Sequence, residues 1–533
     1  MTGAPLVLTE PLGGSALAAA AVAGTAPEGW YRPRPTSPDD WATYLRQTLD
    51  GTTERDWLDR LAPAFAASGA AADRLAAVAA GRGLVVTTGQ QPGLFGGPLY
   101  TWFKALSALA LADRLQAEHG IPVAPVFWAA TDDADFAEAA VTWAARAGGA
   151  VRLELPVPDG PARMLAEVPL GDVSQQFALL ESAAGSAADR APLEAARRAY
   201  GPGETVGGAY LALLRQLLEP LGIAVLDAAH PALRAAADPM LRRALREAPA
   251  VDRALAERTV TVEAAGYRPQ VPLVSGLSLV FRRAPDGSKE RVRLSEAERV
   301  AGEAATGELS ANVLLRPVLE RALLPTLAYV AGPGEITYFA QANAVAGVLG
   351  VPQPLVVPRW SGTIIEPQIQ ALLDRLDLRP DDLRDPHAAE RRFAREAVPA
   401  PVQATLAELR AAIDAATAAL AALEGDARVV VPEVPMGAGR QLRHRVARLE
   451  RRYVAAARHR AARALHDVAT VRGALYPDGM RQERALNLLP LLARHGPVLM
   501  GRIRSAIAAY AGSLVAASGD AVGTGAPADA VAR

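Results

Sequence analysis

The fold is decided by Leu84-Val-Val-Thr-Thr-Gly-Gln-Gln-Pro-Gly-Leu-Phe-Gly-Gly-Pro98 and by the segment Leu99–His119 that follows it. The first five residues are mostly apolar and β-branched, which is typical of a strand buried on both faces. The glycines and prolines form a loop, and the next segment has the pattern of a helix that ends at Gly120. A second buried strand follows at Val123–Ala129. This order predicts a β-loop-α-β unit of a parallel sheet.

A later part of the chain repeats this order. Leu327–Ala331 has the composition of a buried strand, and Gly332-Pro-Gly-Glu335 that of a glycine loop. A helix at Ile336–Leu349 and a strand at Leu355–Val357 follow, and Ile223–Asp227 is a further strand candidate. Loops at the carboxyl ends of parallel strands form the ligand sites of doubly wound sheets. We therefore expect one mostly parallel α/β sheet whose loops meet in a single cleft.

Other segments are expected to surround this sheet. Residues 1–80 are predicted to be helical, with one helix over Asp56–Ala80. Two insertions are expected at about 145–215 and 245–310. The second contains Val274–Leu294, which alternates around a Pro-Asp-Gly turn and predicts an antiparallel hairpin.

The C-terminal third has the pattern of a coiled coil. Apolar residues keep alternating spacings of three and four over Leu406–Leu423, and again over Leu442–Ala456 after a Gly/Pro break at Glu424–Gly439. This pattern predicts an antiparallel helical hairpin, and the basic run Arg440–Arg463 is interpreted as its solvated face. The predicted organisation is a core at 1–365, a coiled-coil domain at 366–475, and a C-terminal helical region with a frayed tail at 476–533.

The composition excludes several classes of protein. Among 533 residues, 56 basic and 57 acidic side chains nearly cancel, which argues against binding to nucleic acid or anionic lipid. Cysteine is absent, which excludes disulfides, thiolate zinc sites and a cysteine nucleophile, and no tightly bound metal is expected. No targeting segment and no membrane span are apparent, so we expect a cytoplasmic protein.

Lysine is rare, and one lysine has an unusual position. Only two of the 56 basic residues are lysine, Lys104 and Lys289. Lys289 lies in a predicted hairpin turn, where almost any polar residue serves. Lys104 lies on the helix after the loop Gly89–Pro98, whose free N–H groups and helix dipole favour an anion that a lysine can reach. The alternative is a tight turn followed by a surface lysine.

An acidic run follows the second strand, with carboxylates at Asp132, Asp133, Asp135 and Glu138. At this end of a buried strand they can supply a general base or hold Mg²⁺. The alternative is a solvated loop whose carboxylates cap the next helix. Gly332-Pro-Gly-Glu335 has a similar pair of interpretations, as a helix cap or as a second loop that faces a ligand.

Several motifs together resemble one known family. They are Thr88–Thr101 with Lys104, Pro125–Trp128 before the acidic run, Asn312 with Arg316-Pro317, Leu324–Ala328 leading into Ala331–Glu335, Val357-Pro-Arg359, and Leu475–Gly479 with Gln482-Glu-Arg484 and Asn487. In this order, from about residue 84 to 500, they resemble the signature of the bacillithiol biosynthesis cysteine-adding enzymes, the cysteine ligases. The family's Glu-Asp-His-Asp is Asp132-Asp133-Ala134-Asp135 here, so an imidazole is missing.

The resemblance implies a fold and a reaction. The implied fold has a Rossmann-like core with small α+β insertions and an α-helical coiled-coil domain that forms a homodimer. The implied reaction joins cysteine to the amine of glucosaminyl-malate. A free carboxylate does not acylate an amine in water without activation, so ATP is expected, optionally with Mg²⁺, through a cysteinyl-adenylate or an acyl phosphate. The nucleotide-binding histidine and lysine motifs of related nucleotide-transferring enzymes are absent.

On this interpretation both glycine loops share one pocket, in which Lys104 faces the acidic run. Lys104 would steady phosphates, an aspartate would orient or deprotonate the amine, and Arg316 and Arg359 would hold the malyl carboxylates. The expected catalytic residues are Lys104, Asp132, Asp133 and Asp135. The expected binding residues are Gly89, Gln90, Gln91, Gly93, Gly96, Gly97, Tyr100, Glu138, Asn312, Arg316, Gly332, Gly334, Glu335 and Arg359.

Two other functions stay open. One is a non-catalytic protein that binds a nucleotide or a sugar and dimerises through its coiled coil, which Ala134 favours because the family's histidine is missing. The other is an adenylate-forming ligase for a different amino acid.

Overall fold

The chain divides into two compact units. The computed structural model describes residues 3–51, 56–385, 387–457, 459 and 461–516. Within them, the sheet unit holds the residues up to 144, 151–364 and those from 482 on, and the coiled-coil unit holds 145–150 and 365–481. The residues from 482 on, expected to belong to a separate C-terminal region at 476–533, thus lie in the sheet unit. The tail expected to be frayed, at 517–533, lies outside the described residues.

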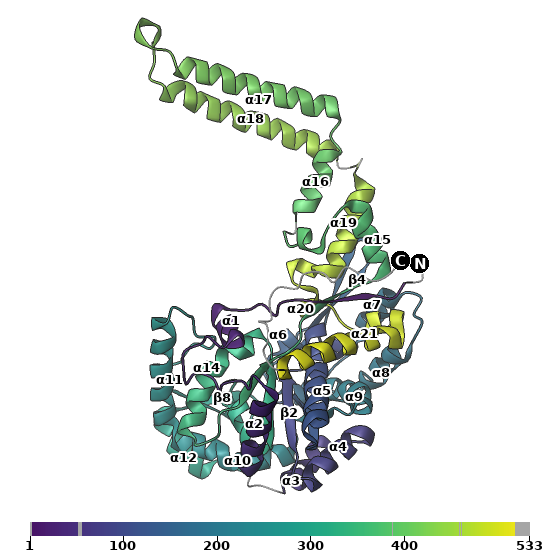
Figure 1. Ribbon diagram of the computed structural model, residues 1–533, viewed down its shortest axis with the longest axis vertical. Coiled ribbons are helices and arrows are strands. Elements are labelled where there is room, and N and C mark those ends of the chain that lie inside the picture. The colour runs from purple at the N-terminus through teal and green to yellow at the C-terminus, as the bar shows by residue number, and fades with distance from the viewer. Residues whose placement is uncertain (1–2, 52–55, 386, 458, 460, 517–533) are drawn as a thin grey trace. The chain divides into compact units, whose positions relative to one another are not determined.

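A parallel sheet forms the centre of the sheet unit (Figure 1). Every neighbouring pair in it is parallel, and the order is β11-β10-β2-β3-β6. Its strands are β2 (Leu84–Gln90), β3 (Val123–Ala129), β6 (Ala224–Asp227), β10 (Thr326–Ala331) and β11 (Leu355–Pro358). The expected parallel α/β sheet is confirmed.

Alternate residues of β2 enter two different cores, because successive side chains point to opposite faces. On one face Leu84 and Val86 pack with α2 (Pro38–Asp50), α5 (Leu99–His119) and α21 (Leu489–Val515). On the other face Val85 belongs to the core that holds α3 (Trp57–Phe65), α4 (Gly69–Ala80), α10 (Pro231–Arg246), α11 (Ala248–Ala264), α13 (Arg316–Leu323) and α14 (Pro333–Val348). Helices therefore cover both faces, as a parallel sheet requires.

Two helices differ from their expected bounds. Asp56–Ala80 forms two helices, α3 and α4, because the chain turns at Ala66, which has a left-handed φ of 42°. Gly332-Pro-Gly-Glu335 is not a loop ahead of a helix. Instead α14 begins at Pro333. Proline fits the first turn of a helix because an N–H group at that position would have no partner within the helix.

The insertions, apart from residues 145–150, and the chain ends complete the sheet unit. The first insertion follows α6 (Phe136–Ala139) and contains the hairpin β4 (Val141–Arg146) and β5 (Gly149–Glu154), then α7 (Ser174–Ala184), α8 (Ala191–Ala199) and α9 (Val206–Leu218). The second contains the expected hairpin, β7 (Leu277–Arg283) and β8 (Lys289–Arg293), with α12 (Ala297–Glu303) and β9 (Leu309–Ala311). The remaining elements are β1 (Leu6–Thr9) paired with β12 (Gly362–Ile365), α1 (Ala16–Ala23) and α20 (Gln482–Ala485).

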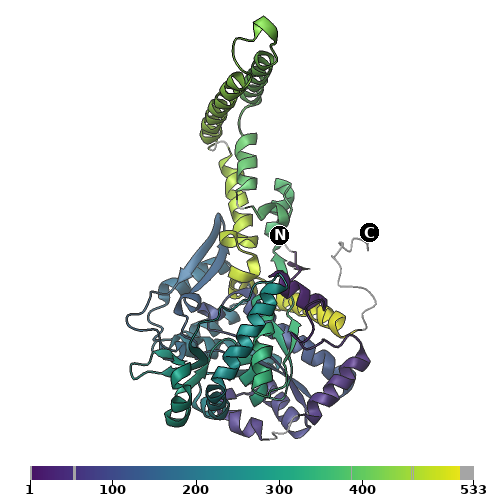
Figure 2. The same cartoon turned by 90° about the vertical axis from the view of Figure 1, so that its left-hand side faces the viewer.

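The coiled-coil unit is built from helices. They are α15 (Pro367–Leu376), α16 (Ala388–Glu396), α17 (Ala400–Ala421), α18 (Glu433–Ala457) and α19 (Ala462–Leu475). Helices α17 and α18 lie side by side as the expected hairpin (Figure 2). The described arginines of the basic run Arg440–Arg463 are exposed, as expected.

The break between these two helices is shorter than expected, because α18 already begins at Glu433. Pro435 fits the first turn of a helix. Gly439 is buried against α17, where a Cβ would lie 3.0 Å from Thr417 Oγ1. This glycine therefore allows a close approach of two helices and does not end one. Among the described residues, no helix has both the length and the apolar composition needed to cross a membrane.

Candidate functional site

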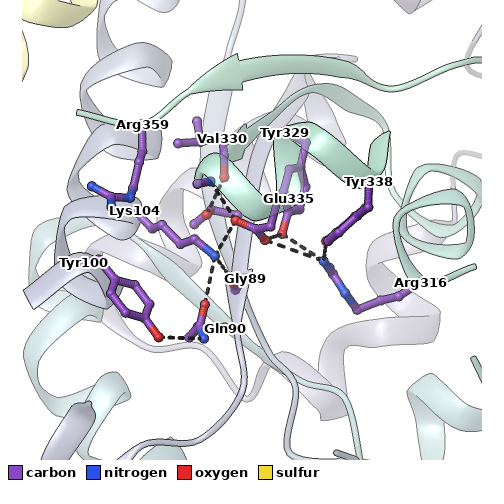
Figure 3. Close-up of polar contacts among 12 residues, drawn as sticks. Gly89, Gln90, Tyr100, Lys104, Arg316, Tyr329, Val330, Glu335, Tyr338 and Arg359 are labelled. Atoms are coloured by element: carbon purple, nitrogen blue, oxygen red, sulfur yellow. Dashed lines mark hydrogen bonds and ion pairs between the residues drawn. The ribbon is translucent and has the colours of Figure 1, made fainter. Parts of the chain in front are cut away.

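The strand order places a ligand site beside β2. From β2 the chain continues outward to β3 and β6, and then returns to β10 on the other side of β2. Doubly wound sheets bind their ligands at the carboxyl ends of the strands where the order reverses in this way. The end of β2 and the residues that follow β10 meet at this point, and Lys104 lies between them (Figure 3).

Lys104 is buried among polar partners. Its side chain is 4% exposed, and Nζ lies 2.5 Å from Glu335 Oε2. Nζ also donates to the Gly89 carbonyl at 2.8 Å and to Gln90 Oε1 at 2.9 Å. The alternative of a surface lysine is therefore wrong. The carboxylate that faces Lys104 is Glu335 of the second unit, whereas Lys104 was expected to face the acidic run.

Glu335 is both a helix cap and a site residue. Oε2 accepts a hydrogen bond from the Gly332 N–H at 2.7 Å, and Oε1 accepts one from the Tyr329 hydroxyl at 2.6 Å. Burial acts to raise the pKa of Glu335, but Lys104 and Arg316 outweigh it and hold the pKa below its usual value. Burial lowers the pKa of Lys104, and Glu335 opposes that effect.

Arg316 extends this network of hydrogen bonds and ion pairs. Its Nη2 donates to the hydroxyls of Tyr329 at 2.9 Å and Tyr338 at 3.1 Å, and its Nη1 donates to Glu320 at 3.2 Å. Burial raises the pKa of Glu320 to about 7. Asn312 lies one turn ahead, and its Oδ1 accepts from the N–H groups of Leu314 and Leu315 in the turn that leads into α13.

Arg359 follows β11 and forms a second buried pair. Both terminal nitrogens lie 2.9 Å from the carboxylate of Glu483 in α20, and the two side chains are 2% and 3% exposed. Its Nε is buried with no hydrogen-bond partner among the residues that the structure describes. A Cβ at Gly332 would lie 3.7 Å from this Nε and 3.7 Å from Lys104 Cε. The position of this Cβ is thus bordered by the cations Lys104 and Arg359, which suit a carboxylate or phosphate, and also by Glu335, whose Oε2 would lie 3.4 Å away.

The glycine loop after β2 is packed inside the protein. A Cβ at Gly96 would lie 2.5 Å from the Trp102 ring, and its φ of 86° is left-handed. The N–H groups of Gly96 and Gly97 bond within the loop, and Asn487 donates to its carbonyls. Packing therefore explains these glycines. A ligand contact of Gln91, Gly93, Gly96, Gly97 or Gly334 stays a prediction.

The acidic run is joined to Lys104 through Gln90. Gln90 Nε2 donates to the Tyr100 hydroxyl at 3.2 Å and to Glu138 Oε1 at 3.4 Å, and the Tyr100 hydroxyl also donates to Glu138 at 3.2 Å. Burial raises the pKa of Glu138. The second glycine unit, Lys104 and one carboxylate of the acidic run are thus contiguous.

The aspartates of this run differ in their surroundings. Asp135 caps α6 by accepting from the Glu138 N–H at 3.1 Å. Asp133 Oδ1 accepts from the N–H groups of Ala134 at 2.6 Å and Asp135 at 3.1 Å, which leaves Oδ2 without a protein partner among the described residues. Burial and the neighbouring Asp132 raise the pKa of Asp133. In the described part of the chain, no three histidine or acidic side chains are grouped so as to hold a metal ion.

Some residues of the site are not among the expected ones. Lys289 Nζ donates to the Asp132 carbonyl and lies 3.7 Å from the Asp132 carboxylate. Its rarity in the sequence was a usable signal, because both lysines contact the candidate site. Glu483 and Asn487 lie in motifs that the family resemblance includes. The buried Glu320, Tyr329 and Tyr338 gave no signal, since their contacts exist only in the folded chain.

Comparison with known proteins identifies the family. The model of the bacillithiol biosynthesis BshC N-terminal Rossmann-like domain matches residues 28–360, and that of the BshC C-terminal coiled-coil domain matches 362–513. A protein of Solibacter usitatus named "Putative cysteine ligase BshC" is 33% identical over 80% of this chain and 82% of its own. Proteins of the same name from Koribacter versatilis (34%, 77% and 79%) and Salinibacter ruber (31%, 80% and 81%) are similar. The chain belongs to the BshC family of bacillithiol biosynthesis, with a Rossmann-like core and a coiled-coil domain.

Proposed function

We propose that this chain is a ligase that joins the carboxyl group of cysteine to the amine of glucosaminyl-malate, with ATP as the source of activation. The relatives named as cysteine ligases support this proposal. The observation on which it mainly rests is the arrangement at the carboxyl edge of the sheet. There Lys104 and the Arg359 Nε lie beside Gly332 together with Glu335, and one carboxylate oxygen of Asp133 has no protein partner among the described residues.

The cations would bind the anionic groups of the reactants. ATP supplies the activation of the cysteine carboxylate. Lys104 and Arg359 would hold a phosphate or carboxylate beside Gly332, in surroundings where burial strengthens the attraction between charges. We keep Arg316 and Arg359 as binding residues for the malyl carboxylates, although their terminal nitrogens already contact protein oxygens.

Asp133 would act as the general base. The amine nitrogen attacks the activated acyl carbon, the new C–N bond forms, and the leaving group departs with its bonding electrons. Asp133 Oδ2 accepts the proton that the amine loses. A raised pKa makes this carboxylate a stronger base, and the two backbone N–H groups on Oδ1 fix its orientation.

Mass spectrometry of the product tests the proposal. Wild-type protein with cysteine, glucosaminyl-malate and ATP should form the amide, and Asp133→Asn should lower kcat about 10²–10⁴-fold. Lys104→Met should also abolish most product formation. Asp172→Asn is the matched control, because Asp172 is exposed and likewise accepts a backbone N–H.

Other outcomes would contradict the proposal. An amide formed with a different amino acid would indicate the alternative ligase, and nucleotide binding without any product would indicate a non-catalytic binding protein. Equal rates for Asp133→Asn and the control would exclude Asp133 as the base.

The same proposal includes a homodimer formed by the coiled-coil unit. Along α17 and α18 several large apolar side chains are 40–57% exposed in the single chain, among them Leu409, Leu420, Leu442, Leu449 and Tyr453. Apolar residues at coiled-coil spacing favour association with another helix. Light scattering should show a dimer for the wild type and a monomer for Leu442→Glu with Leu449→Glu. Arg448→Glu, on the solvated face of the same helix, should stay dimeric.

A further inference from the structure

The loop after β3 is held by side chains and backbone from both insertions. From the first insertion, the Leu165 N–H donates to the Asp133 carbonyl at 2.7 Å and the Ala166 N–H donates to the Thr131 carbonyl at 2.9 Å. From the second, Lys289 donates to the Asp132 carbonyl. Thus each peptide carbonyl from Thr131 to Asp133 accepts a hydrogen bond from an inserted segment.

Lys289 is the charged member of this set. It begins β8, just after the turn of the hairpin, and its side chain is 12% exposed. The ammonium also lies 3.7 Å from Asp132 Oδ2 and 5.7 Å from the centre of the Phe281 ring. A hairpin turn needs no buried cation, so turn formation does not explain this residue.

We propose that Lys289 is a positioning residue of the ligase site, which fixes the loop Thr131–Asp135 so that the Asp133 carboxyl group faces the reacting amine. This inference rests on the proposed function. Lys289 itself touches neither reactant. It acts through the Asp132 carbonyl and carboxylate, which precede the general base directly in the chain.

The charges around Asp133 determine the sign of the effect on pH dependence. The acidic neighbours are Asp132, Asp135 and Glu138 on the same run. From the first insertion Glu167 pairs with Arg283 of the second at 2.7 Å, and Arg234 of α10 lies within electrostatic range of Asp132. Lys289 lowers the pKa of Asp133 against the effects of burial and Asp132. Removing its charge should therefore raise that pKa.

Three variants separate this role from general destabilisation. Lys289→Met removes the donor and the charge but keeps the length of the chain, and Lys289→Arg restores both. Arg293→Met is the matched control, because it removes one positive charge from an exposed position on the same strand. Hydrogen exchange of the peptide that covers residues 130–139 is measured on the full-length protein, together with kcat and kcat/KM between pH 5 and 9.

In Lys289→Met we expect exchange in this peptide to be at least tenfold faster, kcat to fall more than KM rises, and the acidic limb of kcat/KM to move to higher pH. Lys289→Arg should regain most of the wild-type values, and Arg293→Met should equal the wild type. Unchanged exchange in Lys289→Met would overturn the inference, whether or not the protein forms the amide. If wild type forms no amide while the exchange result holds, only the proposed reaction fails.

Discussion

Two ion pairs, one in each unit, have the same separation and opposite surroundings. Arg359 and Glu483 of the sheet unit lie 2.9 Å apart and are almost fully buried. Arg443 and Asp414 of the coiled-coil unit also lie 2.9 Å apart, and each is about half exposed (50% and 52%). Large apolar side chains at coiled-coil spacing, such as Leu420 (57% exposed), are uncovered on the helical hairpin.

This difference indicates that the two units have different roles. Burying a charge costs free energy that only close partners offset, so a cluster of buried charges at a sheet edge indicates a binding or catalytic site. Leaving apolar side chains exposed at regular spacing indicates a surface that another chain covers. The sheet unit is therefore expected to hold the chemistry and the coiled-coil unit the contact between subunits.

The largest effect on stability is expected from breaking the buried pair. Glu483→Gln keeps the shape of the side chain and leaves Arg359 without a counter-charge, so the free energy of unfolding should fall by about 3–5 kcal/mol. Urea unfolding monitored by circular dichroism measures this loss. A loss below 1 kcal/mol would mean that the pair contributes no more than a surface pair, and the contrast between the units would disappear.

Two glycines of the sheet unit should separate packing from ligand binding. Gly96→Ala places a side chain at a left-handed φ and against the Trp102 ring, so it should cost about 2–4 kcal/mol of unfolding free energy. A Cβ at Gly332 meets only ordinary contacts of 3.4–3.7 Å, so Gly332→Ala should cost less than about 1 kcal/mol.

For activity we expect the opposite order. Gly332→Ala, which should lose less stability, should lose more activity. Gly332→Ala fills the space between Glu335, Arg359 and Lys104 and should raise KM for the anionic reactant more than tenfold while the protein stays folded. Thermal unfolding and steady-state kinetics on both variants check this. Normal kinetics for Gly332→Ala would show that no ligand occupies this space.

The sequence predicted the sheet better than the site. Continuous apolar runs and glycine positions located β2, α5 and β3 almost to the residue, because local composition determines where these elements begin and end. A ligand cradle is one predicted role of the glycine loop, but Gly96 packs against the Trp102 ring of the next helix, and the loop carbonyls accept hydrogen bonds from Asn487, far along the chain. The expected partner of Lys104 was likewise a carboxylate of the acidic run, whereas the structure pairs it with Glu335. The sequence does not show this pair, because the end of β2 and the residues after β10 come together only in the folded chain.

The buried Glu320 should make stability depend on pH. Its pKa is about 7 in the folded protein and about 4.3 in an unfolded chain, so between these values the folded state holds more protons. The stability that Glu320 adds is therefore complete below pH 4.3 and is lost as the pH rises to 7. Relative to Glu320→Gln, which does not titrate, wild type should lose stability between about pH 4 and pH 7. Parallel curves from urea unfolding would show that the pair with Arg316 is permanently ionised.

The smallest effect is expected from the exposed counterpart of the first pair. Asp414→Asn removes one charge at the same 2.9 Å separation, but water already screens both groups, so the loss should be about 0.2–1 kcal/mol and should decrease as salt is added. Glu483→Gln should be far less sensitive to salt, because its pair is buried. Equal losses in the two variants would show that distance alone sets the energy of an ion pair here. A clear difference would show that burial does.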